Sequence, residues 1–295
     1  MPATPINGER GLRLPVWLAP RPKPIGAGDD LKKSLRGEKL VTVCEEARCP
    51  NLADCFGRGV ATFMLLGDIC TRTCGFCAVS TGVPGPVDKS EPKRVADMVR
   101  RMGLRHAVLT SVDRDDLEDG GAGQFVAAIH ALRETAAEVT VEVLIPDFGG
   151  SDAALDRVAA SGPQVLNHNL ETVRRLQGVV RPDGKYEHSL GVLEWVNKRY
   201  PGMLTKSGLM VGLGETDSEL IEAFTDLAAA GCDILTLGQY LRPGRDNLPV
   251  DRYLSPEGFG ELKAKALEIG FKHVAAAPLV RSSFNAGAVL KELAT

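Results

Sequence analysis

The chain has 295 residues, a formal net charge of −3 at pH 7 and a sequence pI near 6.0. With 44% hydrophobic and 25% charged residues, it can bury a substantial core and lacks the composition of a disordered protein. It has no excess of lysine and arginine, and no apolar run approaches the roughly 18 residues of a membrane span. We therefore expect a globular protein with no nucleic-acid partner and no membrane partner.

The first 24 residues predict an extended arm that lies on a surface rather than a targeting signal. They contain six prolines and four basic residues, and their one apolar stretch, 14–19, is short and interrupted by Pro15. A secretory signal needs a continuous apolar segment. Without such a signal we expect a cytoplasmic protein whose cysteines stay reduced.

From residue 60 onward, short apolar segments alternate with longer segments in which apolar residues recur every three to four positions. The first pattern is typical of buried strands and the second of amphipathic helices. The predicted strands span 61–66, 105–110, 139–145, 164–170, 205–211 and 233–239. The predicted helices span 92–102, 121–137, 151–161, 187–200, 216–230 and 256–269.

Helix-end signals support this division of the chain. Ser255 and Pro256 have the N-cap and proline order that begins many helices, and glycines follow four predicted helices, at positions 103, 162, 231 and 270. Six strands alternating with helices predict an α/β fold with a parallel sheet and right-handed crossovers. The residues by themselves do not distinguish a partial barrel from an open doubly wound sheet.

Six of the seven cysteines lie between residues 44 and 77, in two groups of three. The second group, Cys70, Cys74 and Cys77, has the spacing C-x3-C-x2-C and follows the first predicted strand. Three thiolates are one ligand short of a four-iron cluster and leave one iron open to a non-protein ligand. A zinc site, the alternative, normally has four protein ligands, and no fourth cysteine or histidine stands at ligand spacing. The pattern therefore favours an iron–sulfur cluster.

The first group, Cys44, Cys49 and Cys55, also lacks a fourth cysteine nearby. A redox pair or a zinc site is the alternative, although neither spacing is C-x2-C. Two incomplete groups in one chain predict two clusters, each with one unusual ligand.

The seventh cysteine, Cys232, stands alone at the start of a predicted strand, and we expect it to be a small buried side chain outside the site.

The C-x3-C-x2-C motif, with Phe76 before its last cysteine, resembles the radical S-adenosylmethionine superfamily. Together with the first cysteine group, it resembles the lipoyl synthase family in particular. The similarity runs from about residue 40 to 287 and includes the segments 43–47, 114–121, 144–148, 212–216, 239–243 and 281–283.

The resemblance implies a fold and its division. It implies a partial (β/α)6 barrel at 59–271, an N-terminal extension at 1–58 with the first cysteine group, and a C-terminal extension at 272–295. It also implies two [4Fe–4S] clusters. One is held by Cys70, Cys74 and Cys77 and cleaves S-adenosylmethionine; the auxiliary one is held by Cys44, Cys49, Cys55 and Ser283. From the residues alone, Ser283 would instead belong to a turn or helix N-cap.

The resemblance also implies the contacts of S-adenosylmethionine. The backbone at Phe76 would meet the adenine, Asn169 and Glu171 would face the ribose and the substrate, and Arg181 would neutralise the carboxylate. The alternative for Arg181 is a solvated loop arginine. The family usually has tyrosine where this chain has Phe284, so no hydroxyl role carries over to that position.

Other polar residues have plainer alternatives. We expect His168, between two asparagines, to be a hydrogen-bonded structural residue rather than a ligand. The acidic residues 113–119 are either part of the site or a solvated loop before a helix. Asp147 and Lys206 are candidates for the pocket, and the pair Gly212 and Gly214 would let backbone approach the adenine or the substrate.

The implied function is that of lipoyl synthase, a sulfurtransferase. It inserts two sulfur atoms at C6 and C8 of an octanoyl chain on a lysine of a lipoyl carrier protein, either an H protein or an E2 lipoyl domain. Breaking an unactivated C–H bond is beyond acid–base side chains, so each insertion needs a 5′-deoxyadenosyl radical from a separate S-adenosylmethionine. The auxiliary cluster would supply the sulfur. Implied partners are an electron donor such as flavodoxin or ferredoxin and an iron–sulfur carrier.

Three other functions compete with this one. Biotin synthase, or another sulfur-inserting relative, is disfavoured by the N-terminal cysteine group. An electron-carrying or iron-storing protein is disfavoured because ferredoxins are usually small and have four cysteines per cluster. A zinc-stabilised binding module would contain neither iron nor acid-labile sulfide, which separates it from the others.

Overall fold

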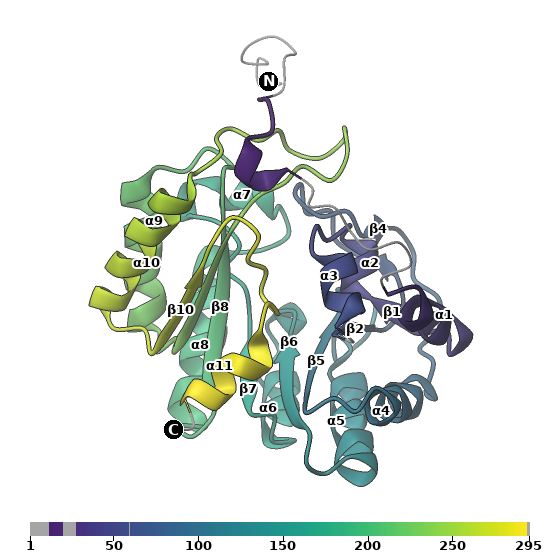
Figure 1. Ribbon diagram of the computed structural model, residues 1–295. Coiled ribbons are helices and arrows are strands. Elements are labelled where there is room, and N and C mark those ends of the chain that lie inside the picture. Colours follow the sequence, from purple (N-terminus) through teal and green to yellow (C-terminus); the bar gives the residue numbers. More distant parts are fainter. Residues whose placement is uncertain (1–11, 20–27, 59, 294–295) are drawn as a thin grey trace.

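The computed structural model describes residues 12–19, 28–58 and 60–293 (Figure 1). Most of the predicted N-terminal arm therefore lies outside the described residues, which contain only its segment 12–19 with the short 3-10 helix Val16–Leu18. Among the described residues, no helix has the length and apolar character needed to cross a membrane.

The described residues form an eight-stranded sheet whose spatial order follows the chain. The strands are β1 (Val41–Thr42), β2 (Thr62–Leu65), β5 (His106–Ser111), β6 (Thr140–Leu144), β7 (Val165–Asn167), β8 (Leu204–Val211), β9 (Ile234–Gln239) and β10 (His273–Ala276). Only β1 runs antiparallel to its neighbour. A doubly wound sheet reverses its strand order at a switch point, and this sheet does not. The fold is therefore a partial barrel.

Helices cover the convex outer face of the curved sheet (Figure 1). The six that alternate with the parallel strands are α4 (Glu91–Arg101), α5 (Ala122–Thr135), α6 (Asp152–Ala160), α8 (Tyr186–Arg199), α9 (Asp217–Ala229) and α10 (Pro256–Ile269). The others are α1 (Asp29–Gly37), α2 (Val43–Glu46), α3 (Leu52–Gly57), α7 (Gln177–Val180), α11 (Ala286–Leu293) and the 3-10 turns Phe148–Gly150 and Arg174–Leu176. A separate parallel pair, β3 (Ile69–Cys70) and β4 (Ser80–Thr81), precedes α4.

The six predicted strands and six predicted helices are all present, with ends that differ by a few residues. The largest difference is at β7, which ends at Asn167 rather than 170. Regular pairing with β8 is interrupted there, since the Leu170 amide donates to Ser207 Oγ, and it resumes as a single bridge between Glu171 and Leu209. The elements β1, β10 and α11 were not predicted. The strand β1 has two residues, and β10 and α11 are rich in alanine, so no apolar periodicity marks them.

Local helix-end predictions are confirmed. Ser255 accepts a hydrogen bond from the Gly258 amide and Pro256 is the first residue of α10. Gly231 follows α9 with φ of 80°, and a Cβ there would overlap the Asn197 side chain. A larger residue at Gly231 would therefore need both a strained backbone and a displaced neighbour.

Two apolar clusters between the sheet and its helices form the core. One includes Phe63, Leu109, Phe125 and Ile129, and the other is built around residues such as Phe224, all fully buried. Because the outer face of the sheet supplies this burial, its inner face is free to hold polar side chains. That inner face forms the floor of the site described below.

Helix α11 lies across the amino ends of the strands (Figure 1). It contacts β5, where Gly287 approaches the His106 side chain, and its Glu292 pairs with His273 at the start of β10 at 3.4 Å. The segment between β10 and α11, which contains Ser283, is thereby held over the inside of the sheet. This placement brings the C-terminal residues to the N-terminal cysteines.

Candidate functional site

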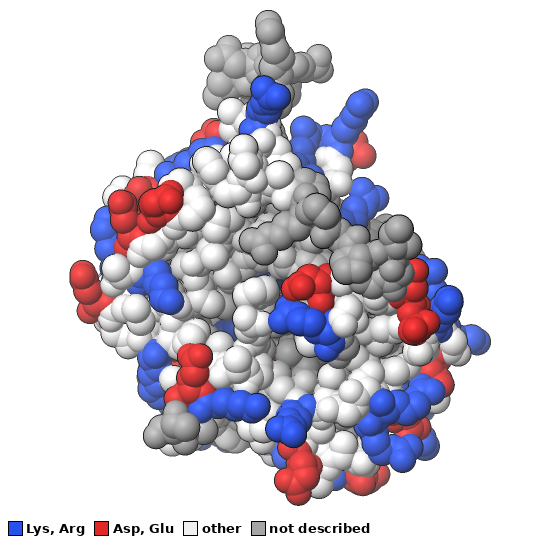
Figure 2. Space-filling view, in the orientation of Figure 1, with Lys and Arg blue, Asp and Glu red and all other residues white. Residues whose placement is uncertain are grey.

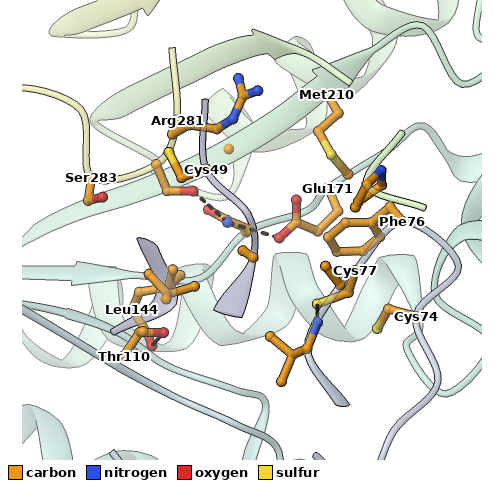
Figure 3. Close-up of a pocket in the computed structure, with 18 of the residues that line it drawn as sticks. Cys49, Cys74, Phe76, Cys77, Thr110, Leu144, Glu171, Met210, Arg281 and Ser283 are labelled. Atoms are coloured by element: carbon orange, nitrogen blue, oxygen red, sulfur yellow. Dashed lines mark hydrogen bonds between the residues drawn. The ribbon is translucent and has the colours of Figure 1, made fainter. Parts of the chain in front are cut away.

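A cavity of about 500 Å³ opens at the carboxyl ends of the parallel strands, where enzymes with this topology place their sites. Residues at the ends of successive strands form its wall, among them Thr110, Leu144, Asn169, Met210 and Gln239. Figure 3 shows cysteines on two sides of this cavity, with Cys74 and Cys77 facing Cys49 and Ser283. Sequence segments far apart in the chain thus meet at one site.

Cys70, Cys74 and Cys77 all line the cavity. The loop that carries them is held by the backbone: Gly75 N–H donates to Val180 at 3.0 Å and Cys77 N–H donates to Cys74 at 3.1 Å. Burial raises the pKa of the Cys74 thiol to about 12 and that of Cys77 to about 11. Thiolates at these positions therefore require a cationic partner, and iron binding would displace the thiol protons.

Arg72, between the first two of these cysteines, fixes the same loop. Its guanidinium pairs with Asp115 at 2.7 Å, with Asp147 at 2.6 Å and with Asp113 at 3.3 Å. Burial alone would raise the pKa of Asp147, but the hydrogen bonds from Arg72 outweigh it and lower that pKa to about 2. Asp113 also approaches the Cys70 sulfur at 3.8 Å. The acidic run therefore orders the cysteine loop.

Polar groups beside this loop remain available to a ligand. Asn169 Nδ2 donates to Glu171 at 2.9 Å and to Ser282 at 2.8 Å, whereas its buried Oδ1 has no hydrogen-bond partner among the described residues. Burial raises the pKa of Glu171. Arg181 is buried at the cavity and donates to the Asn169 carbonyl and to Ser189, both at 3.1 Å. No described carboxylate lies within 4.0 Å of its guanidinium.

The N-terminal cysteines approach the cavity from α2 and α3. Cys44 and Cys49 line it, whereas Cys55, on α3, lies behind them and does not. Burial is the main cause that raises the pKa of Cys44 to about 11, and the nearby Cys49 and Cys55 thiols add to it. The three thiols therefore form one local group, with two of them facing the cavity.

The structure brings Ser283 to this group. The Thr62 hydroxyl of β2 donates to Ser283 Oγ at 2.9 Å, and Thr62 also lies close enough to Cys44 to oppose the rise in the pKa of its thiol. Asn51, between Cys49 and Cys55, donates to the Leu279 carbonyl at 2.7 Å and joins the two ends of the chain. The Ser283 hydroxyl thus faces the cysteines, and the described contacts give it no part in capping α11.

The donor set fits an iron–sulfur cluster at each cysteine group. Each group has three free thiols. All three of Cys70, Cys74 and Cys77 face the cavity, whereas in the N-terminal group Cys44, Cys49 and the Ser283 hydroxyl face it. Within the described part of the chain, no three His, Cys, Asp or Glu side chains are arranged to hold a single metal ion. Cluster ligands bind different iron atoms, so their sulfur atoms lie farther apart than the ligands of one ion.

Several pocket candidates are wrong. Asp147 and Lys206 do not line the cavity: Asp147 binds Arg72, and Lys206 pairs with Glu142 beneath the floor at 2.8 Å. The glycine pair at 212 and 214 also lies outside the wall, and the Glu215 carboxylate occupies the amides of residues 212 and 213, each at 2.8 Å. The backbone there is consequently unavailable to adenine.

Two plainer interpretations agree with the structure. His168 is buried, with Nδ1 2.9 Å from the Ile145 carbonyl and Nε2 3.0 Å from Ser189 Oγ, and does not act as a ligand to anything described. Cys232 is buried at the start of β9, outside the site.

Within the acidic residues 113–119, Asp116 pairs with Arg114, and Asp119 accepts hydrogen bonds from two backbone amides at the start of α5.

Sequence reasoning missed several residues at the site. Thr62, Ser282 and Arg281 line the cavity, and Asn247 Nδ2 donates to the Cys77 carbonyl at 2.7 Å. Thr62 is the polar member of an otherwise apolar strand, and Asn247 follows a strand that ends at the site. These positions in the sequence could have marked Thr62 and Asn247 as site residues, although they do not indicate which side chain or carbonyl each one contacts.

The comparisons agree with this geometry. The family model described as the radical SAM superfamily matches residues 64–227, and that of the N-terminal domain of lipoyl synthase matches residues 4–49. Lipoyl synthase from Rubrobacter xylanophilus is 52% identical over 96% of this chain and 88% of the relative, and that from Methylococcus capsulatus is 54% identical with the same coverage. The FeFe-hydrogenase maturase HydG from Carboxydothermus hydrogenoformans has a similar fold, with a TM-score of 0.56 at 14% identity, covering 90% of this chain and 78% of that one.

Proposed function

This chain belongs to the lipoyl synthase family of radical S-adenosylmethionine enzymes, and from that membership we propose how its residues act. The reaction is insertion of two sulfur atoms, at C6 and C8 of an octanoyl chain on a lysine of a lipoyl carrier protein. The observation that carries the proposal is one cavity lined by cysteines of both groups and by Ser283. A radical source and a sulfur source would thus share one substrate.

Residues of the first cluster site have distinct roles in the proposal. Cys70, Cys74 and Cys77 hold a [4Fe–4S] cluster that, with S-adenosylmethionine, supplies 5′-deoxyadenosyl radicals. The buried Arg181 guanidinium, which has no carboxylate partner among the described residues, binds the carboxylate of S-adenosylmethionine. The unpartnered Asn169 Oδ1 accepts a hydrogen bond from a ribose hydroxyl, and Glu171 is placed beside it.

The backbone at Phe76 meets the adenine in this proposal. Phe76 lines the cavity, and its neighbours Gly75 and Cys77 are fixed by backbone hydrogen bonds. A fixed loop presents its amide and carbonyl groups without an ordering cost at the moment of binding.

The auxiliary site is proposed to hold a second [4Fe–4S] cluster on Cys44, Cys49, Cys55 and Ser283. Its position in the same cavity supports its role as the source of the inserted sulfur. A serine oxygen is a harder ligand than a thiolate and matches iron less well, which suits a cluster that is consumed. Thr62 holds the Ser283 hydroxyl in place through the 2.9 Å hydrogen bond.

Apolar side chains between the two sites fit an acyl chain. The cavity wall includes Met64, Val112, Leu144, Ile145 and Met210, which come from several different strand ends. An octanoyl chain gains free energy when such surfaces replace water around it. The same wall holds a reactive carbon away from solvent, where a radical would otherwise be lost.

The remaining parts of the proposal concern partners and organisation. An H protein or an E2 lipoyl domain presents the acyl-lysine, a flavodoxin or ferredoxin supplies electrons, and an iron–sulfur carrier rebuilds the auxiliary cluster. Reduced free cysteines are compatible with the cytoplasm as the compartment. The working division remains 1–58, 59–271 and 272–295, with β10 of the last segment continuing the sheet.

The test is anaerobic reconstitution followed by turnover on an octanoyl-lysyl peptide with dithionite and S-adenosylmethionine. We expect about eight irons per chain, 5′-deoxyadenosine and a peptide that gains two sulfur atoms. Replacing Cys44, Cys49 or Cys55 with alanine should remove about half of the iron and abolish sulfur insertion. Cleavage of S-adenosylmethionine should persist, because Cys70, Cys74 and Cys77 are unchanged.

The matched control is Cys232→Ala, since Cys232 is a buried cysteine outside the site. This variant should keep both its iron content and its product. Lipoyl product from a Cys44, Cys49 or Cys55 variant would overturn the assignment of the sulfur source. Deoxyadenosine without sulfur gain in the unmodified enzyme would move the search to another substrate.

A further inference from the structure

Three exposed arginines gather at the mouth of the cavity, and we call them the arginine rim: Arg48, Arg242 and Arg245. Arg48 follows α2, and the other two belong to the loop between β9 and α10. Arg48 and Arg242 line the cavity, so the rim lies where a substrate must enter. Arg48 donates to the Pro243 carbonyl at 3.0 Å and joins the two segments.

The charges of the arginine rim are not neutralised by described residues. No carboxylate in the described ranges lies within 4.0 Å of its guanidinium groups, and Arg48 and Arg242 donate hydrogen bonds to backbone carbonyls instead. Arg242, for example, donates to Asn247 at 2.8 Å and to the carbonyl of Arg245. The loop has two acidic side chains, Asp246 and Asp251, and neither lies within 4.0 Å of a rim guanidinium, so the mouth stays positive in a chain of net charge −3.

The space-filling view agrees with an excess of positive charge near the mouth of the cavity. In Figure 2, blue atoms gather at the upper right, where Figure 1 places the protruding loop between β9 and α10. Positive charge confined to the mouth of a site attracts an oppositely charged partner to that position and orients it there.

The loop is fixed to the cysteine loop beneath it. Leu248 N–H donates to the Gly75 carbonyl at 2.9 Å, and Asn247 donates to the Cys77 carbonyl at 2.7 Å. A Cβ at Gly75 would lie 3.0 Å from the Leu248 side chain, so the two loops pack closely. The arginines therefore hold a set position relative to Cys77 and lose little conformational freedom on binding.

We infer that the arginine rim docks an acidic face of the carrier protein around its acylated lysine. This inference rests on the proposed function, because an acyl-lysine would enter the mouth to reach both cysteine groups while the folded carrier remains outside. Guanidinium groups whose N–H bonds already reach carbonyls keep further N–H donors for carboxylates. The rim would then select carriers by the charge next to the lysine, and the cavity would select the acyl chain.

The test compares binding and turnover in the full chain with both clusters loaded. The variant is Arg245→Glu, whose side chain does not line the cavity, and Lys265→Glu on the outer helix α10 is the control with the same change of charge. One probe is a fluorescently labelled octanoylated H protein, whose Kd is read by anisotropy at low and high salt. The other is an octanoyl-lysyl peptide with uncharged flanking residues.

We expect the variant to raise the Kd for the H protein about fivefold and to reduce its salt dependence, because one of the three rim charges is reversed. Turnover of the uncharged peptide should change by less than about twofold, and the control should match the unmodified enzyme. An H protein with amides in place of the carboxylates that flank its lysine should bind the unmodified enzyme weakly and lose nothing further with the variant.

An unchanged Kd for the H protein would overturn the inference, as would an equal loss of turnover on the uncharged peptide. The binding measurement does not depend on sulfur insertion. A rim that binds the H protein in an enzyme that inserts no sulfur would therefore count against the proposed function alone. Sulfur insertion with no effect of the arginine substitution would count against the rim alone.

Discussion

His168 shows how a buried side chain supports the site without entering it. Its Nδ1–H donates to the Ile145 carbonyl, which can only accept, so Nε2 accepts from the Ser189 hydroxyl. Ser189 in turn accepts from the Arg181 guanidinium. This chain of hydrogen bonds requires a neutral imidazole, and it fixes the arginine that we assign to the carboxylate of S-adenosylmethionine.

Protonation of His168 should therefore weaken the fold. Burial lowers its pKa to about 4 from the ordinary 6.5, so below pH 6.5 the unfolded chain binds a proton that the folded chain does not. As the pH is lowered from 7.5 to 5.5, the free energy of unfolding therefore decreases, and His168 contributes about 1.4 kcal/mol of this decrease. Urea titrations at the two pH values measure this: the difference in unfolding free energy between the unmodified enzyme and His168→Asn should be smaller at pH 5.5 by this amount. The same pH dependence in both proteins would contradict a buried, neutral His168.

The cysteine loop between β3 and β4 depends on contacts with neighbouring strand ends. Arg72 ties it to Asp113 and Asp115 after β5 and to Asp147 after β6. Thr71 Oγ1 adds a hydrogen bond to Asp115 at 2.8 Å. The loop itself is too short to set the spacing of three thiols, so its conformation depends on these contacts with the barrel.

Arg72→Lys should disturb the cluster site although it keeps the charge. One ammonium cannot reproduce the planar, multidentate contacts of the guanidinium with three carboxylates. Loss of such supporting contacts typically lowers metal affinity about 10- to 100-fold. Iron should therefore be lost from this site during gel filtration with a chelator. Arg114→Lys is the control, since Arg114 pairs with Asp116 outside the cavity; equal iron retention in the two variants would contradict this role.

Across the whole molecule, a buried ion pair joins strands that are not neighbours. Lys206 of β8 and Glu142 of β6 meet at 2.8 Å inside the barrel, and β7 lies between their strands. Burial by itself raises the pKa of Glu142, but Lys206 and His106 outweigh it and the pKa is lowered. Glu142 is therefore ionised at neutral pH, and its pair with Lys206 closes the floor beneath the cavity.

Lys206→Met should destabilise the fold by about 3–5 kcal/mol, because it leaves a buried carboxylate without its partner. The double variant with Glu142→Leu should recover most of this loss, since neither charge then remains. Lys272→Met, which removes an exposed ion pair with Asp233, should cost less than about 1 kcal/mol. Chemical denaturation measures all three, and a double variant less stable than Lys206→Met would contradict the account.

The sequence predicted most of the fold because its signals are local. Apolar periodicity located six of the parallel strands and six of the helices, and Ser255 with Pro256 marked a helix start. The sequence missed β1, β10 and α11, which show no apolar period. It also overextended β7, because nothing local predicts that the Leu170 amide donates to the Ser207 side chain.

The candidate site was only partly predictable. Six cysteines within one short segment, with their spacing, indicated two clusters, and the family resemblance added Phe76, Asn169, Glu171 and Arg181, which all line the cavity. Asp147 and Lys206 were placed wrongly because each satisfies its charge with a partner far away in the sequence. A charged residue near a strand end gives no sign of that partner.

By itself, the sequence determined the α/β class and the family, because ligand spacing within a loop and apolar periodicity are properties of neighbouring residues. Tertiary structure alone decided which distant groups meet. It placed Ser283 against Thr62 and in the same cavity as Cys44, set Arg48 next to the loop of Arg242, and held Arg72 among three carboxylates. These contacts arise from the packing of strands and loops far apart in the chain, and no local pattern encodes them.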